Sequence, residues 1–413
     1  MTVPRFLPLY VCFAAAYVLS YTYRTVNAVI SPELTAGLGV SASSLGLLTS
    51  AYFIAFASMQ VPCGILLDRY GPRRIEPILL VVAALGAAAF AASDTLAGLT
   101  AARALIGAGV AVCLMAPLKA IATWYPPERQ PSLGGWMMFA GGVGALISTT
   151  PVAAALDVVS WRTIFVVLAI ATLTVAVAVG WVVPDMPHDM RAAAANGAWR
   201  GVKLVYRHAR LWWIAPLTGL GMGSLMAIQG LWSVPWMMEI NGYTRGEAAN
   251  HLLAMGFTTL AGYAFVALAS TRLVRVGIAP RHLVICGYAL QLAMLGLIVT
   301  SAVPFTYVVW ALYGFTAAVN ILGYLLLTDG FSTDLAGRAS TALNLVTFST
   351  TFAVQWGIGA VADAVRVAYG VDLAAGLRVA FALVFVAEAA AYLWFVLQWR
   401  RHAVVGRLAT VAP

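Results

Sequence analysis

The residue of this sequence best suited to binding chemistry is Arg24, which lies inside a long apolar run at about residues 7–30. A charged side chain within a membrane helix costs about 2.5–3.5 kcal/mol or more, so it faces a protein interior or water and is a functional candidate by default. Tyr17, Tyr21 and Asn27 recur at helical spacing and share its face. A guanidinium in a dry site favours carboxylate or phosphate, because its planar fork donates two parallel hydrogen bonds. This face is predicted to bind an anionic group; alternatively, Arg24 reaches the outer interface or binds backbone carbonyls.

Neutral polar and aromatic side chains line one face of three apolar runs in the second half of the chain. Amide and phenol groups inside a membrane need hydrogen-bond partners, which a ligand or a neighbouring helix can supply. Pro235 is expected to kink or break the first of these runs. The residues predicted to line a substrate site on these faces are Gln229, Trp232 and Trp236; Asn320 and Tyr324, with Tyr313; and Asn344 and Gln355, with Phe348 and Thr351.

Two further cations, Arg103 and Lys119, lie on one apolar run. They are 16 residues apart, which at 100° per residue separates them by about 160° around a helix. Both therefore cannot face one cavity. Lys119 is a substrate candidate or an interfacial lysine, and Arg103 is a gating candidate or a structural arginine.

Catalytic signatures are missing from the sequence. It shows no metal-ligand cluster, no phosphate-binding glycine loop before a soluble helix, and no nucleophile beside a base. The four cysteines fall in apolar segments without paired spacing, so they are expected to be packing residues. We therefore expect no enzyme activity, cofactor, metal site or nucleic-acid partner.

The composition explains why polar side chains within the apolar runs are informative. Of 413 residues, 62% are hydrophobic and 9% charged, against roughly 25% charged in an ordinary soluble domain. Long apolar runs separated by short polar breaks are typical of transmembrane helices, so soluble and secreted classes fit poorly. Twelve runs are predicted to span a membrane, at about 7–30, 44–67, 77–93, 97–123, 132–154, 163–183, 211–237, 248–271, 282–301, 305–328, 339–361 and 377–399.

Basic residues predict the orientation of these runs. The net charge of +9 is concentrated in every second loop and in both tails, so the positive-inside rule makes those loops and both termini cytoplasmic. The residues Met1 to Arg5 resemble the start of a signal peptide, but no small-residue cleavage site follows, and the first run is expected to remain as a membrane helix. The arginine-, alanine- and valine-rich composition is typical of a GC-rich bacterial genome, which predicts a bacterial inner-membrane protein.

An internal repeat predicts how the chain is divided. A polar stretch separates two sets of six runs, giving a bundle at 1–183, a cytoplasmic linker at 184–210 and a bundle at 211–413. The linker is expected to hold a short amphipathic helix from Trp199 to His208. Arg69 and Gly71 after the second run match Arg275 and Gly277, an offset of 206 residues. Two parallel six-helix repeats are implied.

The loop after the second run resembles the signature of the major facilitator superfamily, a family of secondary transporters. It reads G-x-x-x-D-R-x-G-x-R-R, and the segment from Arg103 through Gly107 to Gly109 is similar to a second motif of that family. The resemblance covers the whole chain and implies an all-α integral membrane protein, with twelve transmembrane helices in two parallel six-helix repeats around a central cavity, working by alternating access. The gating candidates that it suggests are Gly64, Asp68, Arg69, Gly71, Arg73, Arg74 and Arg103.

Asp68 is predicted to act as a gate latch by pairing with a neighbouring arginine. Gly71 permits backbone conformations that other residues resist. The alternative is that the loop charges only fix the topology. Val274 stands where the second repeat would carry the acid, so only the first half has such a latch.

The position of Arg24, near tyrosines in the first helix, resembles the organic-anion and metabolite branch of the family more than its drug/proton antiporters. The Gly-Pro motif of drug antiporters is absent from the fifth run, and the seventh lacks the second arginine found in phosphate-ester antiporters. The expected substrate is therefore a small carboxylate-bearing metabolite, an amino acid or a sugar acid. The alternatives are export of hydrophobic or cationic compounds, and a nutrient sensor that binds without transporting.

A coupling group is harder to identify. Glu388 in the last run is the one acid that these runs place well inside a helix, and a structural contact is preferred for it because that helix is usually peripheral in the family. A uniporter, an exchanger, or coupling through interfacial acids such as Asp329 all stay open. The expected partners are a small-molecule substrate and the lipid bilayer, with a coupling proton or ion left open and a monomeric state.

Overall fold

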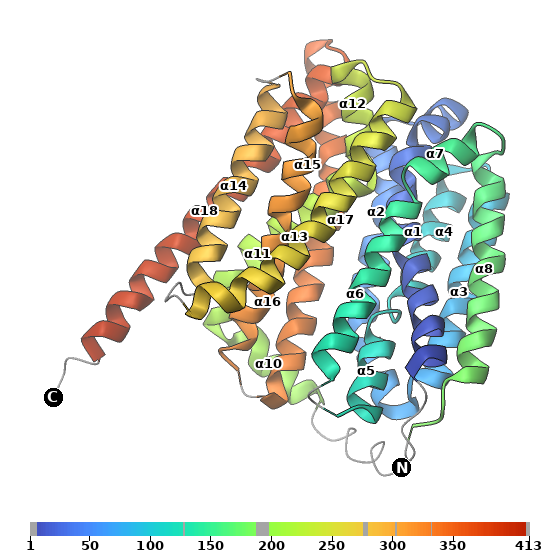
Figure 1. Cartoon of the computed structure of the whole chain (residues 1–413). Coiled ribbons are helices and arrows are strands. Elements are labelled where there is room, and N and C mark those ends of the chain that lie inside the picture. Colours follow the sequence, from blue (N-terminus) through green and yellow to red (C-terminus); the bar gives the residue numbers. More distant parts are fainter. Residues whose placement is uncertain are drawn as a thin grey trace.

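The computed structural model describes residues 6–126, 129–186, 198–275, 280–301, 304–331 and 333–409. All regular structure in these ranges is helical, and the helices run roughly side by side in two groups, one from each half of the chain (Figure 1). The all-helical prediction is confirmed for this part of the chain.

The first half begins with the longest helix of that half, α1, which carries Arg24 near its middle. Serine and threonine side chains cap three of the following helices by accepting a hydrogen bond from the first turn: Ser41, Thr95 and Ser160. The helices of this half are α1 (Phe6–Leu38), α2 (Ala42–Tyr70), α3 (Pro72–Ala92), α4 (Leu96–Val110), α5 (Met115–Trp124), α6 (Gln130–Ile147), α7 (Thr150–Leu156) and α8 (Trp161–Val182).

The second half starts with the amphipathic linker helix α10 (Ala198–Arg207), where the sequence predicts one. Two of its membrane segments change helix type part-way, through the π-helical turn η1 (Ile228–Trp232) and the 3-10 turn η2 (Ala318–Asn320). The other helices are α11 (Ala209–Ala227), α12 (Ser233–Asn241), α13 (Arg245–Arg275), α14 (Pro280–Thr300), α15 (Thr306–Ala317), α16 (Ile321–Thr328), α17 (Thr333–Tyr369) and α18 (Leu373–Ala409).

Each predicted apolar run falls on one helix or on one broken helix. Ten segments of the described residues are long and apolar enough to span a membrane; α1 and α13 fall outside this set. One boundary that differs is the start of α3, which begins at Pro72 and not near residue 77, because proline is favoured in the first turn of a helix. This change brings Glu76 into the helix.

A break inside the fourth run was not predicted. The chain leaves the α-helix at residues 111–114, between α4 and α5. Pro117 explains the break, because it has no N–H to donate to the carbonyl four residues earlier, that of Cys113.

The two halves meet along α2 and α17, which pack against each other in antiparallel directions. Glycines permit the close approach. A Cβ at Gly46 would lie 2.9 Å from the Gln355 carbonyl oxygen, and one at Gly359 would overlap the backbone of Ala42. Further along, the rings of Phe56 and Phe348 are 4.3 Å apart between centroids.

Polar contacts also join the halves at the end of the molecule where α7 and α12 lie (Figure 1). Arg245 at the start of α13 forms ion pairs with Glu33 of α1 and with Asp157 after α7. The Ser43 N–H donates to the Asp363 carboxylate at 2.7 Å. At the opposite end, near α5 and α10, the Asp68–Lys119 and Arg210–Asp329 ion pairs each stay within one half.

Candidate functional site

The Arg24 side chain is buried between the two halves, with 5% of its surface exposed. Three aromatic rings surround its guanidinium carbon: Tyr21 at 4.4 Å from the ring centroid, and Phe56 and Phe348 at 5.3 Å each. Phe348 belongs to the second half. Among the residues that the structure describes, no carboxylate forms an ion pair with Arg24, and its Nε has no hydrogen-bond partner. The site therefore holds a positive charge without a counter-charge.

Phenol groups from both halves surround this charge. Tyr17 and Tyr21 pack edge to face with ring centroids 5.1 Å apart. Gly141 of α6 makes room for them, since a Cβ there would be 2.6 Å from the Tyr17 ring. From the second half, Tyr263 of α13 and Tyr324 of α16 lie close enough to Tyr21 and Arg24 to interact with them electrostatically.

Amide groups lie on the α7 side of the guanidinium. Asn27 is 1% exposed, and neither atom of its amide has a partner among the described residues. Gln355 donates from Nε2 to Thr49 Oγ1 at 2.7 Å, whereas its buried Oε1 has no hydrogen-bond partner among the described residues. Gly230 of η1 packs closely beside them, since a Cβ there would lie 3.3 Å from the Arg24 carbonyl oxygen and 3.8 Å from Gln355 Oε1.

This arrangement suits an anion that also carries hydroxyl groups. A desolvated guanidinium binds a carboxylate strongly through charge-assisted hydrogen bonds. Buried amide groups without partners, such as those of Asn27 and Gln355, are costly unless a ligand or water satisfies them. The predicted residues Tyr17, Tyr21, Arg24, Asn27 and Gln355 come together in the structure, and Tyr324 faces them.

Other predicted substrate residues have partners elsewhere. Asn320 lies inside the second half, where it bonds Tyr288 and donates to Gln291 Oε1 at 3.0 Å. Trp232 donates from Nε1 to the Gln355 carbonyl at 2.8 Å, but Trp236 stacks on Phe381 of α18, with ring centroids 4.3 Å apart. Trp232 and Trp236 thus contact different helices, α17 and α18, and the π-helical turn η1, on which Gln229 also lies, changes the helical spacing here. Asn344 accepts a hydrogen bond from the Tyr324 hydroxyl at 2.6 Å.

Lys119 lies away from Arg24. Its Nζ is 2.6 Å from the Asp68 carboxylate, and this ion pair joins α5 to α2. The sequence predicted an arginine as the partner of Asp68, so the partner is corrected to Lys119. The helix break at 111–114 separates α4, which carries Arg103, from α5, which carries Lys119.

The remaining gating candidates cluster around the α2–α3 turn. Gly71 has φ +80°, a conformation that favours glycine. Arg73 and Arg74 each lie 3.6 Å from Asp185, and Arg73 also donates from Nε to the Gly180 carbonyl at 3.1 Å. The Arg69 guanidinium carbon is 5.2 Å from the Tyr70 ring centroid. A Cβ at Gly64 would meet nothing within 4 Å.

Arg103 is placed inside the first half, with 1% of its surface exposed. Its Nη1 donates to the Tyr23 carbonyl at 2.9 Å, and its guanidinium carbon lies 5.1 Å from the Tyr52 ring centroid. These contacts tie α4 to α1 and α2, which favours the structural alternative. The counterpart motif of the second repeat, at Arg275 and Gly277, lies outside the residues whose side chains the structure describes.

Two residues of the site were missed by sequence reasoning. Tyr263 lies in a helix whose moderate polarity gave no clear face, and Phe56 is one of many phenylalanines in apolar runs. The positions of Tyr52, Phe53 and Phe56 do not form a polar face that would mark Phe56 as a site residue. Only the packing of α2 against α17 and α1 brings it to Arg24.

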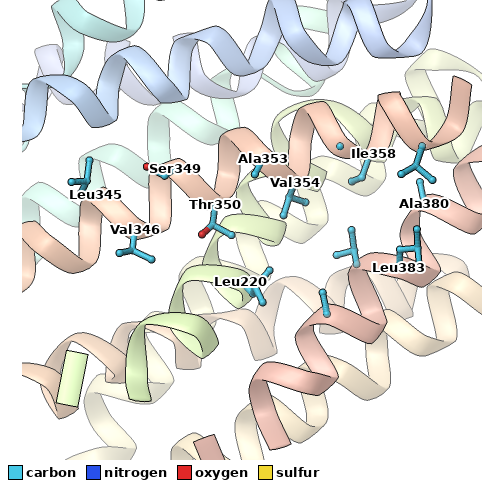
Figure 2. A pocket seen from close by; sticks show the side chains of 14 residues that line it. Leu220, Leu345, Val346, Ser349, Thr350, Ala353, Val354, Ile358, Ala380 and Leu383 are labelled. Atoms are coloured by element: carbon cyan, nitrogen blue, oxygen red, sulfur yellow. The ribbon is translucent and has the colours of Figure 1, made fainter. Parts of the chain in front are cut away.

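A pocket of about 630 Å³ lies elsewhere, between α11, α17 and α18 (Figure 2). Its lining is almost entirely apolar, with Leu220, Val354 and Leu383 among the side chains that face it. None of the predicted substrate residues lines it. The apolar lining suits hydrocarbon and not an anion, so we place the candidate site at Arg24.

Comparison with solved structures shows the fold. A bacterial homologue of the human lysosomal transporter Spinster, in an inward-facing and unoccupied conformation, aligns over 95% of this chain and 96% of that chain with a TM-score of 0.76 and 16% identity. A D-xylose–proton symporter aligns over 94% and 96% with a TM-score of 0.73 and 15% identity.

Comparison with curated proteins finds sugar-acid carriers. The hexuronate transporter of Escherichia coli K12 is 29% identical over 150 residues, which is 36% of this chain and 35% of that protein. The galacturonate transporter of Dickeya chrysanthemi is 26% identical over 156 residues, 38% and 45% of the two chains. The matches thus span about a third to a half of the relatives' own length.

The family is settled by a longer match. The family model described as Major Facilitator Superfamily matches residues 13–355, which is most of the chain. The many apolar helices agree with a multi-pass membrane protein. The chain therefore belongs to the Major Facilitator Superfamily, and within it resembles the organic-anion branch of the hexuronate and galacturonate transporters more than the drug/proton antiporters.

Proposed function

We propose that this protein is a secondary transporter that moves a small organic anion, of the sugar-acid class, across the membrane by alternating access. The observation that carries the proposal is Arg24, a buried guanidinium that no described carboxylate neutralises and that rings from both halves enclose. Burying a charged side chain within a membrane protein costs free energy, so such a residue is expected to have a function. A substrate carboxylate is the counter-charge that the site needs.

The surrounding groups favour a hydroxylated carboxylate over a simple fatty acid. Tyr17, Tyr21, Tyr263 and Tyr324 offer hydroxyl groups, and the Gln355 Oε1 is a buried acceptor without a partner in the described part of the chain. The relatives named as hexuronate and galacturonate transporters have carboxylate sugars in their names, which supports the same substrate class.

The proposed architecture has twelve membrane-spanning helices in two parallel six-helix repeats, with bundles at 1–183 and 211–413 and a cytoplasmic linker at 184–210. The two helices α1 and α13, added to the ten apolar segments, would give the twelve membrane-spanning helices. Polar side chains, Arg24 among them, lower the hydropathy of these two helices. Both termini would be cytoplasmic and the membrane would be the bacterial inner membrane, on the distribution of basic residues.

In this orientation the end joined by Arg245 and by Ser43–Asp363 faces outward. The structure would then represent a state that is closed to the outside. The likeness to an inward-facing solved structure supports this assignment.

The test is a thermal-shift and uptake series on the purified protein with D-glucuronate, D-galacturonate, an amino acid mixture, a sugar phosphate and a cationic dye. A ligand at 100 times its Kd stabilises the native state by about 2.7 kcal/mol. We expect hexuronates to raise the melting temperature of the wild-type protein and to have no effect on Arg24→Gln, while Lys119→Gln responds as the wild type does.

Two results would oppose the proposal. Stabilisation by cationic or apolar compounds alone, equal in wild type and Arg24→Gln, would favour an exporter. Hexuronate binding without uptake of labelled hexuronate into proteoliposomes would favour a sensor.

A further inference from the structure

A buried carboxyl group lies in the first half, at Glu76 of α3. Its side chain is 0% exposed, and neither carboxyl oxygen has a hydrogen-bond partner among the described residues. An ionised carboxylate in such a place is very costly, so the group is held neutral by a proton while the surroundings stay dry. None of the hydrogen bonds and ion pairs described above involves the Glu76 carboxyl.

The packing of α3 against α4 shows what faces the carboxyl. The two helices are antiparallel and very close: a Cβ at Gly86 would lie 2.8 Å from the Ile106 nitrogen, and one at Gly109 would lie 2.6 Å from the Leu79 carbonyl oxygen. Continuing this register by one turn brings Glu76 to the break at 111–114. Pro117 cannot donate to the Cys113 carbonyl, so that carbonyl lacks its intrahelical partner at the break.

The break also contains a residue that interacts with both Glu76 and the Arg24 site. Cys113 interacts electrostatically with both Glu76 and Arg24. The 111–114 segment therefore lies in the electrostatic field of both Glu76 and Arg24. A negative Glu76 would partly neutralise the field that attracts an anion, and a protonated Glu76 would leave that field intact.

The titratable groups on the helices around Glu76 are few. The thiols of Cys12 on α1 and of Cys113 interact with it directly, and Cys63 on α2 interacts with Cys113. On α8 the one ionisable side chain in the described range is Arg162, which is bound to Asp94 at the other end of the bundle.

The charged residues near the ends of these helices have other contacts: Arg73 and Arg74 of α3 each lie 3.6 Å from Asp185, and the Arg69 guanidinium of α2 lies over the Tyr70 ring. On α4, Arg103 is bonded to the Tyr23 carbonyl. On α2 and α5, Asp68 and Lys119 pair with each other at 2.6 Å. Glu76 therefore has no permanent counter-ion among the described residues, and a proton is the cation that fits the space.

We propose that Glu76 is a proton-binding site that couples proton movement to anion transport, so that the proton and the substrate anion travel together. This inference rests on the proposed function. Glu76 takes a proton from water on the side where the anion binds, which leaves the charge of Arg24 free for the substrate carboxylate. Loss of the proton on the other side returns a negative charge near Cys113 and weakens anion binding there.

The experiment measures D-glucuronate affinity of the purified full-length protein from pH 5 to pH 8, together with uptake into proteoliposomes driven by an inward proton gradient. We expect wild-type affinity to fall by about tenfold as the pH rises, because a negative charge gained inside the protein opposes the binding of an anion. Glu76→Gln should bind with the same affinity at every pH, retain exchange of internal for external glucuronate, and lose accumulation driven by the proton gradient.

Glu388→Gln is the matched control, since Glu388 is a second buried carboxyl without a partner in the described residues, and it lies in the other half. It should keep the wild-type pH dependence. A wild-type pH profile in Glu76→Gln, or loss of the profile in Glu388→Gln, would overturn the inference and leave Arg24 as the anion site.

A measurement on the wild-type protein covers the case in which Glu76→Gln does not fold. Dicyclohexylcarbodiimide modifies protonated carboxyl groups within membranes, and peptide mass spectrometry locates the product. Modification of Glu76 that decreases with rising pH is expected, and unmodified Glu76 at low pH would count against the inference. Absence of glucuronate and of all other carboxylate binding in the wild type would overturn the proposed function itself.

Discussion

The guanidinium of Arg24 and the ring of Phe348 come from opposite halves of the chain, yet the guanidinium carbon lies 5.3 Å from the ring centroid. A cation this close to an aromatic face is stabilised by about 0.5–2 kcal/mol, more when it is desolvated. The contact exists only while α1 and α17 keep their present separation. Any rocking of the two halves must therefore change the environment of the proposed anion site.

Arg245 is the first place to test this relationship between the halves. It holds α13 of the second half to Glu33 and Asp157 of the first half. Arg245→Gln should weaken this conformation by about 1 kcal/mol, a roughly fivefold shift in the ratio of states, since partly exposed ion pairs contribute on that scale. The measurement is the distance distribution between spin labels at Val158 and Val367, which are exposed at the same end.

Arg162→Gln is the control for this shift. Arg162 is also paired, at 2.6 Å from Asp94, but both residues belong to the first half. This variant should lower the melting temperature without changing the label distances. Equal distance changes in both variants would show that Arg245 does not act as an inter-half contact.

Tyr263 tests the part of the site that sequence reasoning missed. Its hydroxyl is placed near Arg24 and Tyr324, so a bound carboxylate or sugar hydroxyl has a donor there. Tyr263→Phe should weaken hexuronate binding about tenfold, because hydrogen bonds to charged groups are worth about 1.5–3 kcal/mol. Tyr243→Phe removes a hydroxyl bonded to Thr306 at 2.7 Å outside the site and should bind normally. Isothermal titration would reveal the difference, and equal affinities would remove Tyr263 from the site.

Hydropathy predicted the helices of this protein well, because each membrane segment must bury its backbone hydrogen bonds and expose apolar side chains. It predicted the helix breaks poorly. Pro117 and the π-helical turn at 228–232 change direction and spacing inside apolar runs, where hydropathy stays uniform. Glu76 was overlooked for a related reason, since the apolar run was taken to begin one residue after it.

The candidate site was predictable where one residue carried its own signal. Arg24 and its helical neighbours stand out because charge inside an apolar run is costly. Phe56 and Tyr263 carry no such signal and depend on which helices meet. The partner of Asp68 was assigned to an adjacent arginine because the sequence shows neighbours along the chain, whereas Lys119 reaches it across α2 and α5.

The Asp68–Lys119 pair is predicted to adjust the balance of states and not the affinity of the site. Its side chains are 44% and 28% exposed, so the pair itself should contribute only about 0.2–1 kcal/mol. Asp68→Asn and Lys119→Gln should each change the spin-label distances in the same direction, and the double variant should change them no further. Additive effects in this double-mutant cycle would show that the two residues act independently.

Two glycines of the family motifs should respond in opposite ways to a single methyl group. At Gly107 a Cβ would overlap the Tyr52 carbonyl in the contact between α4 and α2, so Gly107→Ala should destabilise the protein by about 1–3 kcal/mol. At Gly64 nothing lies within 4 Å of a Cβ, and alanine is the better helix former by about 0.5–1 kcal/mol. Gly64→Ala should therefore melt at the wild-type temperature or slightly above it.

Thermal unfolding of both variants in one detergent checks the pair, and a large loss of stability in Gly64→Ala would mean that α2 is packed more closely there than the structure shows. Normal stability with impaired uptake in Gly64→Ala would instead indicate that another helix approaches Gly64 in the alternate state.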